Sequence, residues 1–155
     1  ATMMNGNRAI DLGGTVLAFK LDGNLDLPIS DIVQATVPEL PDGDFGVDQI
    51  SEGDDIYHAQ CASCHGGIGI PNEVAIVAPD LRLMTLSTHD VMSDIVIGGS
   101  RADRGMPEFR DAITSDQLES IRAFVVEQAR RLKEFQEQNQ EAVESAANEE
   151  ALNRA

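Results

Sequence analysis

Two cysteines and a histidine stand together in the segment Cys61-Ala62-Ser63-Cys64-His65, and these are the residues best suited to chemistry. Two thiols three positions apart, followed at once by an imidazole, can anchor and ligate one haem. The cysteine sulfurs would add to the porphyrin vinyl groups as thioethers, and His65 would reach the iron from the same side of the ring. The motif therefore predicts one covalently bound haem c with His65 as an iron ligand.

Two other chemistries suit the same residue types. A zinc site needs about four Cys, His or carboxylate ligands, but the chain has only two cysteines and no second CxxC pair. A thioredoxin-like dithiol follows a strand and begins a helix, whereas residues 48–60 have a pattern that predicts a helix ending at the motif. Both alternatives are therefore weaker than haem attachment.

Further candidate site residues follow the motif. The Pro79 carbonyl is a candidate acceptor for the second ring N–H of His65, because ligating imidazoles usually donate that proton to a fixed acceptor. Arg82 could pair with a haem propionate, although a solvated surface arginine remains an alternative. Met106 stands in the Gly105-Met106-Pro107 loop between two predicted helices, where a thioether could return over the opposite face of the ring.

Met106 is the predicted sixth ligand of the iron. A methionine opposite a histidine raises the reduction potential and favours electron transfer over oxygen chemistry. The competing ligands have weaker positions; Met92, for example, lies on an apolar helix face that predicts core packing. The other competitors are Met84, His58 and His89.

Helices are expected on both sides of the motif and after the Met106 loop. Gly53 and Tyr57 recur with Cys61 at a spacing of four, which places them on one helix face. A second helix is predicted from Ser87, and a long one begins with the capping box at residues 114–117. Phe124 or Ile121 of that last helix should pack against Gly53 and Tyr57.

The two ends of the chain differ from its middle. Residues 1–46 form an N-terminal extension with a predicted strand at 15–21 and a linker rich in Pro and Asp. Residues 47–133 form the predicted haem domain. Residues 134–155 form an acidic helical or disordered tail, since positions 134–150 hold six Glu and no Lys or Arg.

Composition narrows the class of protein. The 155 residues carry 27 acidic and 11 basic side chains, a net charge of −16 that argues against nucleic acid as a partner. No apolar run approaches the roughly 18 residues of a membrane span, so the chain is not expected to span a membrane. Thioether attachment of haem implies export to the bacterial periplasm, and we expect any secretion signal to lie outside this sequence.

The order of these motifs resembles a class I c-type cytochrome over roughly residues 47–132. The resemblance rests on Gly53, Tyr57, the Cys61–His65 motif, Pro79-Asp80-Leu81, Gly105-Met106-Pro107 and a final helix with Ile121 and Phe124. It implies a mainly α fold with helices around one covalent haem. It also implies the axial pair His65 and Met106, with the Pro79 carbonyl on His65 and Tyr57 among the residues around the cofactor.

A second resemblance concerns residues 14–28. The run Gly14-Thr15-Val16-Leu17-Ala18-Phe19-Lys20-Leu21-Asp22-Gly23, followed by Leu27-Pro28, is similar to the end of the β-propeller in quinohemoprotein alcohol dehydrogenases. In that family a linker leads to a C-terminal cytochrome module. The pyrroloquinoline quinone (PQQ) and calcium of that family would belong to a partner domain outside this chain.

Three hypotheses on function follow. The chain could take electrons from a PQQ alcohol dehydrogenase domain or subunit and pass them to a downstream acceptor, with no catalytic site of its own. It could instead be a free-standing periplasmic electron carrier. A haem enzyme or gas sensor with an open iron site would require that Met106 not bind the iron.

Overall fold

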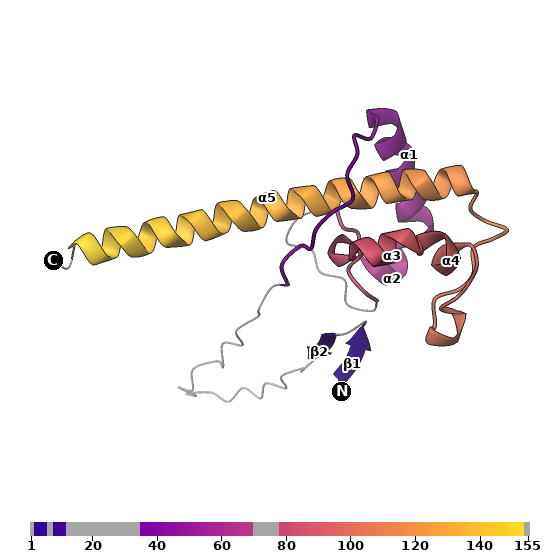
Figure 1. Cartoon of the computed structure of the whole chain (residues 1–155), viewed down its shortest axis with the longest axis horizontal. Helices are drawn as coiled ribbons and strands as arrows, with labels where there is room; N and C mark the ends of the chain where they lie inside the picture. The colour runs from indigo at the N-terminus through magenta and orange to yellow at the C-terminus, as the bar shows by residue number, and fades with distance from the viewer. Residues whose placement is uncertain (1, 6–7, 12–34, 70–77, 154–155) are drawn as a thin grey trace, which may run out of the picture. The chain divides into compact units, whose positions relative to one another are not determined.

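The computed structural model describes residues 2–5, 8–11, 35–69 and 78–153 (Figure 1). The chain divides into two compact units, Ala1–Ala35 and Thr36–Ala155. In the first unit, β1 (Thr2–Asn5) and β2 (Arg8–Asp11) pair antiparallel, with Thr2 opposite Asp11. Sequence analysis did not predict this hairpin, and the strand predicted at residues 15–21 lies outside the described residues.

Two crossing helices hold the second unit together. α1 (Val47–Gln60) packs on the first turns of α5 (Ser115–Asn153), as Figure 1 shows. Gly53 makes this crossing close, because a Cβ atom at that position would overlap the Ser120 carbonyl. Tyr57 lies one turn further along α1, and its ring centroid is 5.3 Å from that of Phe124. The predicted contact between these two helices is confirmed.

The start of α5 is set by local hydrogen bonds. The Gln117 N–H donates to Thr114 Oγ1 at 3.2 Å, and the Thr114 N–H donates to Gln117 Oε1 at 3.0 Å. This exchange is the capping box predicted from the sequence. The apolar face that follows is buried in the crossing with α1 and in the core; its fully buried members include Leu118, Ile121, Phe124, Val125 and Val126.

Shorter helices complete the core below α1 and α5. The helix predicted from Ser87 is observed as α3 (Leu86–Asp90) and α4 (Met92–Val96). The prediction of a single helix is wrong, because Val91 has φ −102° and ψ 13° and interrupts the helical backbone. The helix also begins one residue before Ser87, at Leu86, and Thr85 is its N-cap residue. Met92, Ile95 and Val96 are buried, as the apolar pattern predicted.

Residues 36–46, part of the predicted linker, pack along α5. The Val37 N–H donates to Gln136 Oε1 at 3.2 Å, and Val37 forms a small buried cluster with Ala129 and Leu132. Arg130 donates to the Gly43 carbonyl at 2.6 Å and lies over the Phe45 ring. α5 continues without a break through residue 133, and its C-terminal part extends beyond the other elements of this unit (Figure 1). The domain boundaries at 46 and 133 stay predictions.

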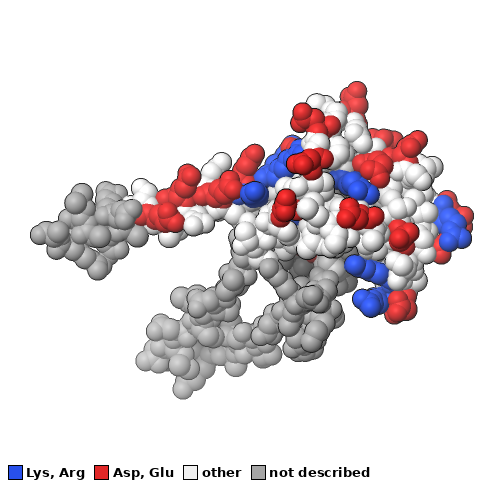
Figure 2. All heavy atoms as spheres, viewed as in Figure 1, with Lys and Arg blue, Asp and Glu red and all other residues white. Residues whose placement is uncertain are grey.

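The regular elements described in residues 36–153 are helices, which agrees with the mainly helical fold that the sequence predicted. Acidic side chains are spread over the helical unit and along α5 (Figure 2). Among the helices in the described parts of the chain, none is both long enough and apolar enough to cross a membrane.

Candidate haem-attachment site

The Cys61–His65 motif forms a single tight turn at the end of α1. The Cys61 N–H donates to the Tyr57 carbonyl at 2.8 Å, which continues the last turn of α1, and α2 (Ala62–His65) follows directly. The His65 N–H then donates to the Cys61 carbonyl at 2.9 Å. Gly66 ends the turn with φ +78°, a backbone conformation that favours glycine. The helical backbone therefore brings both thiols and the imidazole together within about one turn.

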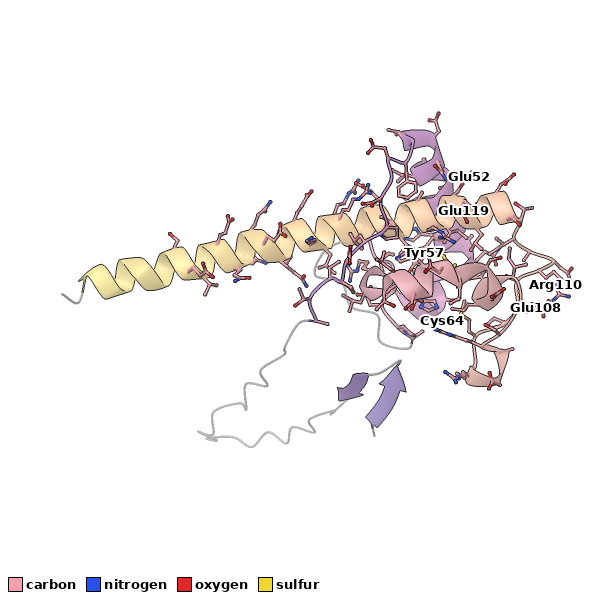
Figure 3. All side chains as sticks on the ribbon, in the orientation of Figure 1. Glu52, Tyr57, Cys64, Glu108, Arg110 and Glu119 are labelled. Atoms are coloured by element: carbon pink, nitrogen blue, oxygen red, sulfur yellow. The ribbon has the colours of Figure 1, made fainter. Side chains whose placement is uncertain are left out.

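Both cysteines carry free thiols, in different surroundings. Cys61 is partly buried, whereas Cys64 is exposed (Figure 3). Burial, with a smaller contribution from the neighbouring Cys64, raises the pKa of Cys61 to about 11. The Cys61 thiol is therefore protonated at neutral pH. Nucleophilic dithiols need a lowered pKa, so this environment argues against a thioredoxin-like redox pair.

The imidazole of His65 has a fixed orientation and tautomer. His65 is 8% exposed, and its Nδ1 lies 2.7 Å from the Pro79 carbonyl oxygen. Because a carbonyl can only accept, Nδ1 must carry the proton. In the neutral ring Nε2 is then unprotonated and can bind a metal. The hydrogen bond predicted between His65 and Pro79 is thus present, and it prepares the other nitrogen as a ligand.

Tyr57 supports the same turn from the helix side. Its side chain is fully buried at the crossing of α1 and α5, near the motif that holds Cys64 (Figure 3). The Tyr57 hydroxyl donates to the Gly66 carbonyl at 2.7 Å. This bond ties α1 to the residue that follows His65. Tyr57 is therefore connected to the end of the motif by its hydrogen bond to the Gly66 backbone carbonyl.

Met106 lies in a loop whose backbone requires a glycine. Gly105 follows the short 3-10 helix η2 (Ala102–Arg104) and has φ +91°. The loop is fastened to α4 by a hydrogen bond of 2.9 Å from the Phe109 N–H to the Val96 carbonyl. Met106 is partly buried and packs against the same apolar cluster as Cys61. Its role as an iron ligand stays a prediction.

The competing ligands occupy other surroundings. Met84 and Met92 are buried in the apolar core. His58 is half-exposed and lies 2.7 Å from the Asp54 carboxylate. His89 is 2% exposed, and its Nδ1 is a buried nitrogen without a hydrogen-bond partner among the described residues. Met106 differs from the two buried methionines in being only partly buried, in the loop that follows Gly105.

Arg82 is placed differently from the expectation that the sequence raised. Its guanidinium pairs with Asp80, with Nη2 at 2.7 Å from Oδ2, and the side chain is only 2% exposed. The solvated surface arginine that the sequence left open is therefore wrong. This pair was not predicted from the sequence, although Asp80 stands two residues before Arg82 at the start of a short helix, which was a signal for it. A propionate contact of Arg82 stays a prediction.

The residues fit a covalently bound haem by their chemistry. Two thiols at the required spacing, an imidazole with a free Nε2 and a thioether in a defined loop are the donors that haem c uses. In the described parts of the chain, no three His, Cys, Asp or Glu side chains come together as a metal site would require. Haem needs no such cluster, because thioethers and axial ligands hold it.

Comparison with protein families gives a match over half of the chain. The family model described as "Cytochrome C oxidase, cbb3-type, subunit III" matches residues 48–125. This range begins in α1, includes the Cys61–His65 motif and the Met106 loop, and ends within the buried part of α5.

Characterised relatives are similar over a longer range. The chain is 32% identical over 114 residues to 1-butanol dehydrogenase (cytochrome c) of Thauera butanivorans, which covers 73% of this chain and 16% of that protein. It is 32% identical over 117 residues to quinohemoprotein alcohol dehydrogenase ADH-IIG of Pseudomonas putida, which covers 76% of this chain and 16% of that protein. The chain thus spans about a sixth of the length of these relatives.

Solved structures agree. The structure of ADH-IIG from Pseudomonas putida HK5 aligns with a TM-score of 0.54 and 29% identity, covering 72% of this chain and 15% of that one. The quinohemoprotein alcohol dehydrogenase of Comamonas testosteroni aligns with a TM-score of 0.51 and 25% identity, covering 71% of this chain and 15% of that one.

Proposed function

The chain belongs to the class I c-type cytochromes, and from this premise we propose that it carries electrons for a quinone-dependent alcohol dehydrogenase. It would accept electrons from a PQQ-containing dehydrogenase domain or subunit and pass them to a downstream acceptor. The relatives named above support this proposal, because their names join a cytochrome or a haem to alcohol oxidation. PQQ and calcium would belong to the dehydrogenase part.

Haem c, when bound, supplies one-electron chemistry at its iron. Cys61 and Cys64 would hold the ring through thioethers. His65 would bind the iron through Nε2, and Met106 would bind through its sulfur. With His65 and Met106 as its iron ligands, the haem would have no position left for a substrate. This donor set is suited to electron transfer rather than to oxygen chemistry.

The observation that carries the proposal is the hydrogen bond from His65 Nδ1 to the Pro79 carbonyl, at 2.7 Å. It fixes the tautomer in which Nε2 is a ligand, and it increases the basicity of that nitrogen. A solvated surface histidine would have no need of a backbone carbonyl acceptor. The same bond was expected from the resemblance to class I cytochromes.

The proposal includes a compartment. Thioether attachment of haem takes place in exported compartments of bacteria, so we assign the chain to the periplasm. A free-standing periplasmic carrier remains the second candidate. The match to this chain covers only 16% of each of these relatives, and their greater length favours the dehydrogenase-associated role.

An absorption spectrum of the haem-loaded protein tests the ligand set. Oxidised wild-type protein should show the weak long-wavelength band of sulfur-to-iron charge transfer, and Met106→Ala should abolish it. Met92→Ala, which removes a buried methionine of α4, is the matched control and should retain the band. Wild-type protein that lacks the band and binds CO readily would instead be an open-site haem enzyme or gas sensor.

A kinetic experiment tests the partner. Oxidised haem-loaded protein is mixed with a PQQ alcohol dehydrogenase that its alcohol has already reduced, and haem reduction is followed by stopped flow. The proposal expects reduction that depends on the dehydrogenase concentration. Equal rates with dehydrogenase stripped of PQQ would contradict the role in alcohol oxidation while leaving the haem site intact.

A further inference from the structure

The Pro79 carbonyl, which accepts the hydrogen bond from His65, is followed by an ion pair between Asp80 and Arg82. This pair is called the Asp80–Arg82 clamp. The Asp80 carboxylate accepts four hydrogen bonds from Arg82. Oδ1 accepts from the Arg82 backbone N–H at 3.0 Å and from Nε at 3.0 Å. Oδ2 accepts from Nε at 3.2 Å and from Nη2 at 2.7 Å. Asp80 thereby caps η1 (Leu81–Leu83) and holds the guanidinium in a two-pronged arrangement.

The clamp is buried on the arginine side. Arg82 is 2% exposed and the Asp80 side chain is 12% exposed. An ion pair in such surroundings is weakly screened by solvent, and its planar geometry restricts both side chains. The exposed pairs of α5, such as Glu127 with Arg131, have no comparable restriction. The Asp80–Arg82 clamp is therefore a rigid feature of this loop.

One peptide group, between Pro79 and Asp80, connects the clamp to the hydrogen bond that His65 makes. The carbonyl that accepts from His65 Nδ1 belongs to Pro79, and the nitrogen of the same planar peptide group belongs to Asp80. Fixing the backbone of Asp80 therefore fixes the direction of the Pro79 carbonyl. Proline restricts the other side of that group through its ring.

We infer that Asp80 and Arg82 are positioning residues for His65: by holding the 79–80 peptide group, they aim the Pro79 carbonyl at Nδ1 and so set the orientation and basicity of the imidazole. This inference rests on the proposed role of His65 as an iron ligand. It gives Arg82 a function that does not depend on a propionate contact.

Positioning and simple electrostatics predict different signs of the change in reduction potential. A weaker Nδ1–H bond makes His65 a less basic ligand, which destabilises oxidised iron and raises the potential. Removing either Asp80 or Arg82 from the clamp should therefore raise the reduction potential. If only charge mattered, removing the anion of Asp80 would raise the potential, whereas removing the cation of Arg82 would lower it.

The test compares Asp80→Asn, Arg82→Gln and the double variant in haem-loaded protein. In the reduced state, proton NMR follows solvent exchange of the His65 Nδ1–H. We expect exchange about tenfold faster in both single variants, the factor that corresponds to losing an ordinary hydrogen bond. The potential should rise in all three variants. Faster exchange in both single variants supports the inference, and unchanged exchange in either one overturns it.

Two controls separate positioning from loss of stability. Ser120→Ala breaks the bond of 2.7 Å to Glu52 at the crossing of α1 and α5, so it lowers stability without touching His65. Its Nδ1–H exchange should stay at the wild-type rate. Arg131→Gln removes one positive charge from an exposed pair and should leave exchange and potential unchanged.

A conservative variant covers the case in which the neutral variants do not fold. Arg82→Lys keeps the buried charge but cannot form the two-pronged arrangement, so exchange should again accelerate. Unchanged exchange in Arg82→Lys would overturn the inference. Failure of the proposed function itself is recognised separately: wild-type protein would then lack the sulfur-to-iron band, or its haem would be reduced equally fast by dehydrogenase stripped of PQQ, whatever its Nδ1–H exchange rate.

Discussion

At the scale of single residues, His89 and Arg122 are notable because the haem chemistry does not use them. His89 belongs to α3 and is 2% exposed, and its Nδ1 and the Nε of Arg122 on α5 both lack hydrogen-bond partners within the described residues. Burial lowers the pKa of His89 below its ordinary value; Arg122 lowers it further, and Asp90 opposes the shift. The folded domain therefore favours the neutral imidazole.

This environment predicts a pH-dependent stability. Because the folded-state pKa lies below the unfolded value of 6.5, His89 contributes stability above that pH and loses it as pH falls toward the folded pKa. We expect the urea unfolding free energy of the haem-loaded protein to decline between about pH 7 and about pH 5, and His89→Gln to reduce this decline. A slope that His89→Gln does not alter would contradict the assignment.

The residues at the site were predictable to different degrees. The His65–Pro79 bond followed from the motif because the chemistry of a ligating imidazole demands an acceptor. Arg82 was harder to predict. The sequence shows its charge, but only the fold shows that its guanidinium pairs with the Asp80 carboxylate. The burial of His89 was also hidden, since it depends on α3 packing near Arg122 of a distant helix.

At the scale of elements, the crossing of α1 and α5 depends on a missing side chain. Gly53→Ala would place a methyl group on the Ser120 backbone carbonyl, which cannot move aside without shifting α5. We expect a loss of about 1–3 kcal/mol in the free energy of unfolding, the usual range for overpacking. Urea unfolding measures it.

Gly46→Ala is the matched control for that prediction. Gly46 precedes α1 with φ −65°, and a Cβ atom there would meet no heavy atom within 4 Å. The loss in the free energy of unfolding should be clearly smaller for Gly46→Ala than for Gly53→Ala. Equal costs for the two variants would mean that close packing is not the reason for glycine at position 53.

Elements with strong local signals were predicted well. The capping box before α5 and the Gly53–Tyr57 face of α1 were recognisable because both depend on spacing within one helix. The interruption at Val91 was not, because a continuous apolar pattern there suits one helix or two. The β1–β2 hairpin was missed because Thr2–Asn5 and Arg8–Asp11 have no clear alternation of apolar and polar residues.

At the scale of the whole helical unit, α5 has two parts with different environments. Up to Gln136 it carries buried residues and the hydrogen bond to Val37. Beyond that point, the described side chains of residues 137–145 are exposed, and this segment contains Glu residues but no Lys or Arg. The two parts should therefore differ in their contribution to stability.

Two truncations test this difference. Removing residues 138–155 should change the unfolding free energy by less than about 1 kcal/mol, because the side chains described in the removed part, those of residues 138–145, are exposed. Removing residues 129–155 deletes Ala129 and Leu132 from their cluster with Val37 and should cost about 2–5 kcal/mol. Thermal and urea unfolding of both forms, each with haem attached, provide the comparison. A large loss from the shorter truncation would show that the acidic end supports the fold.

The contact between Gly53 and Ser120 also sets the order in which α1 and α5 can complete their packing. Glu52 and Ser120 are hydrogen-bonded across 68 positions of sequence, so α1 cannot complete its packing until α5 has been made. A chain that emerges from its N-terminus presents Cys61, Cys64 and His65 well before that helix exists. Both thiols are therefore synthesised before the helix that completes the packing of α1, so the motif is available for haem attachment before this part of the domain has folded.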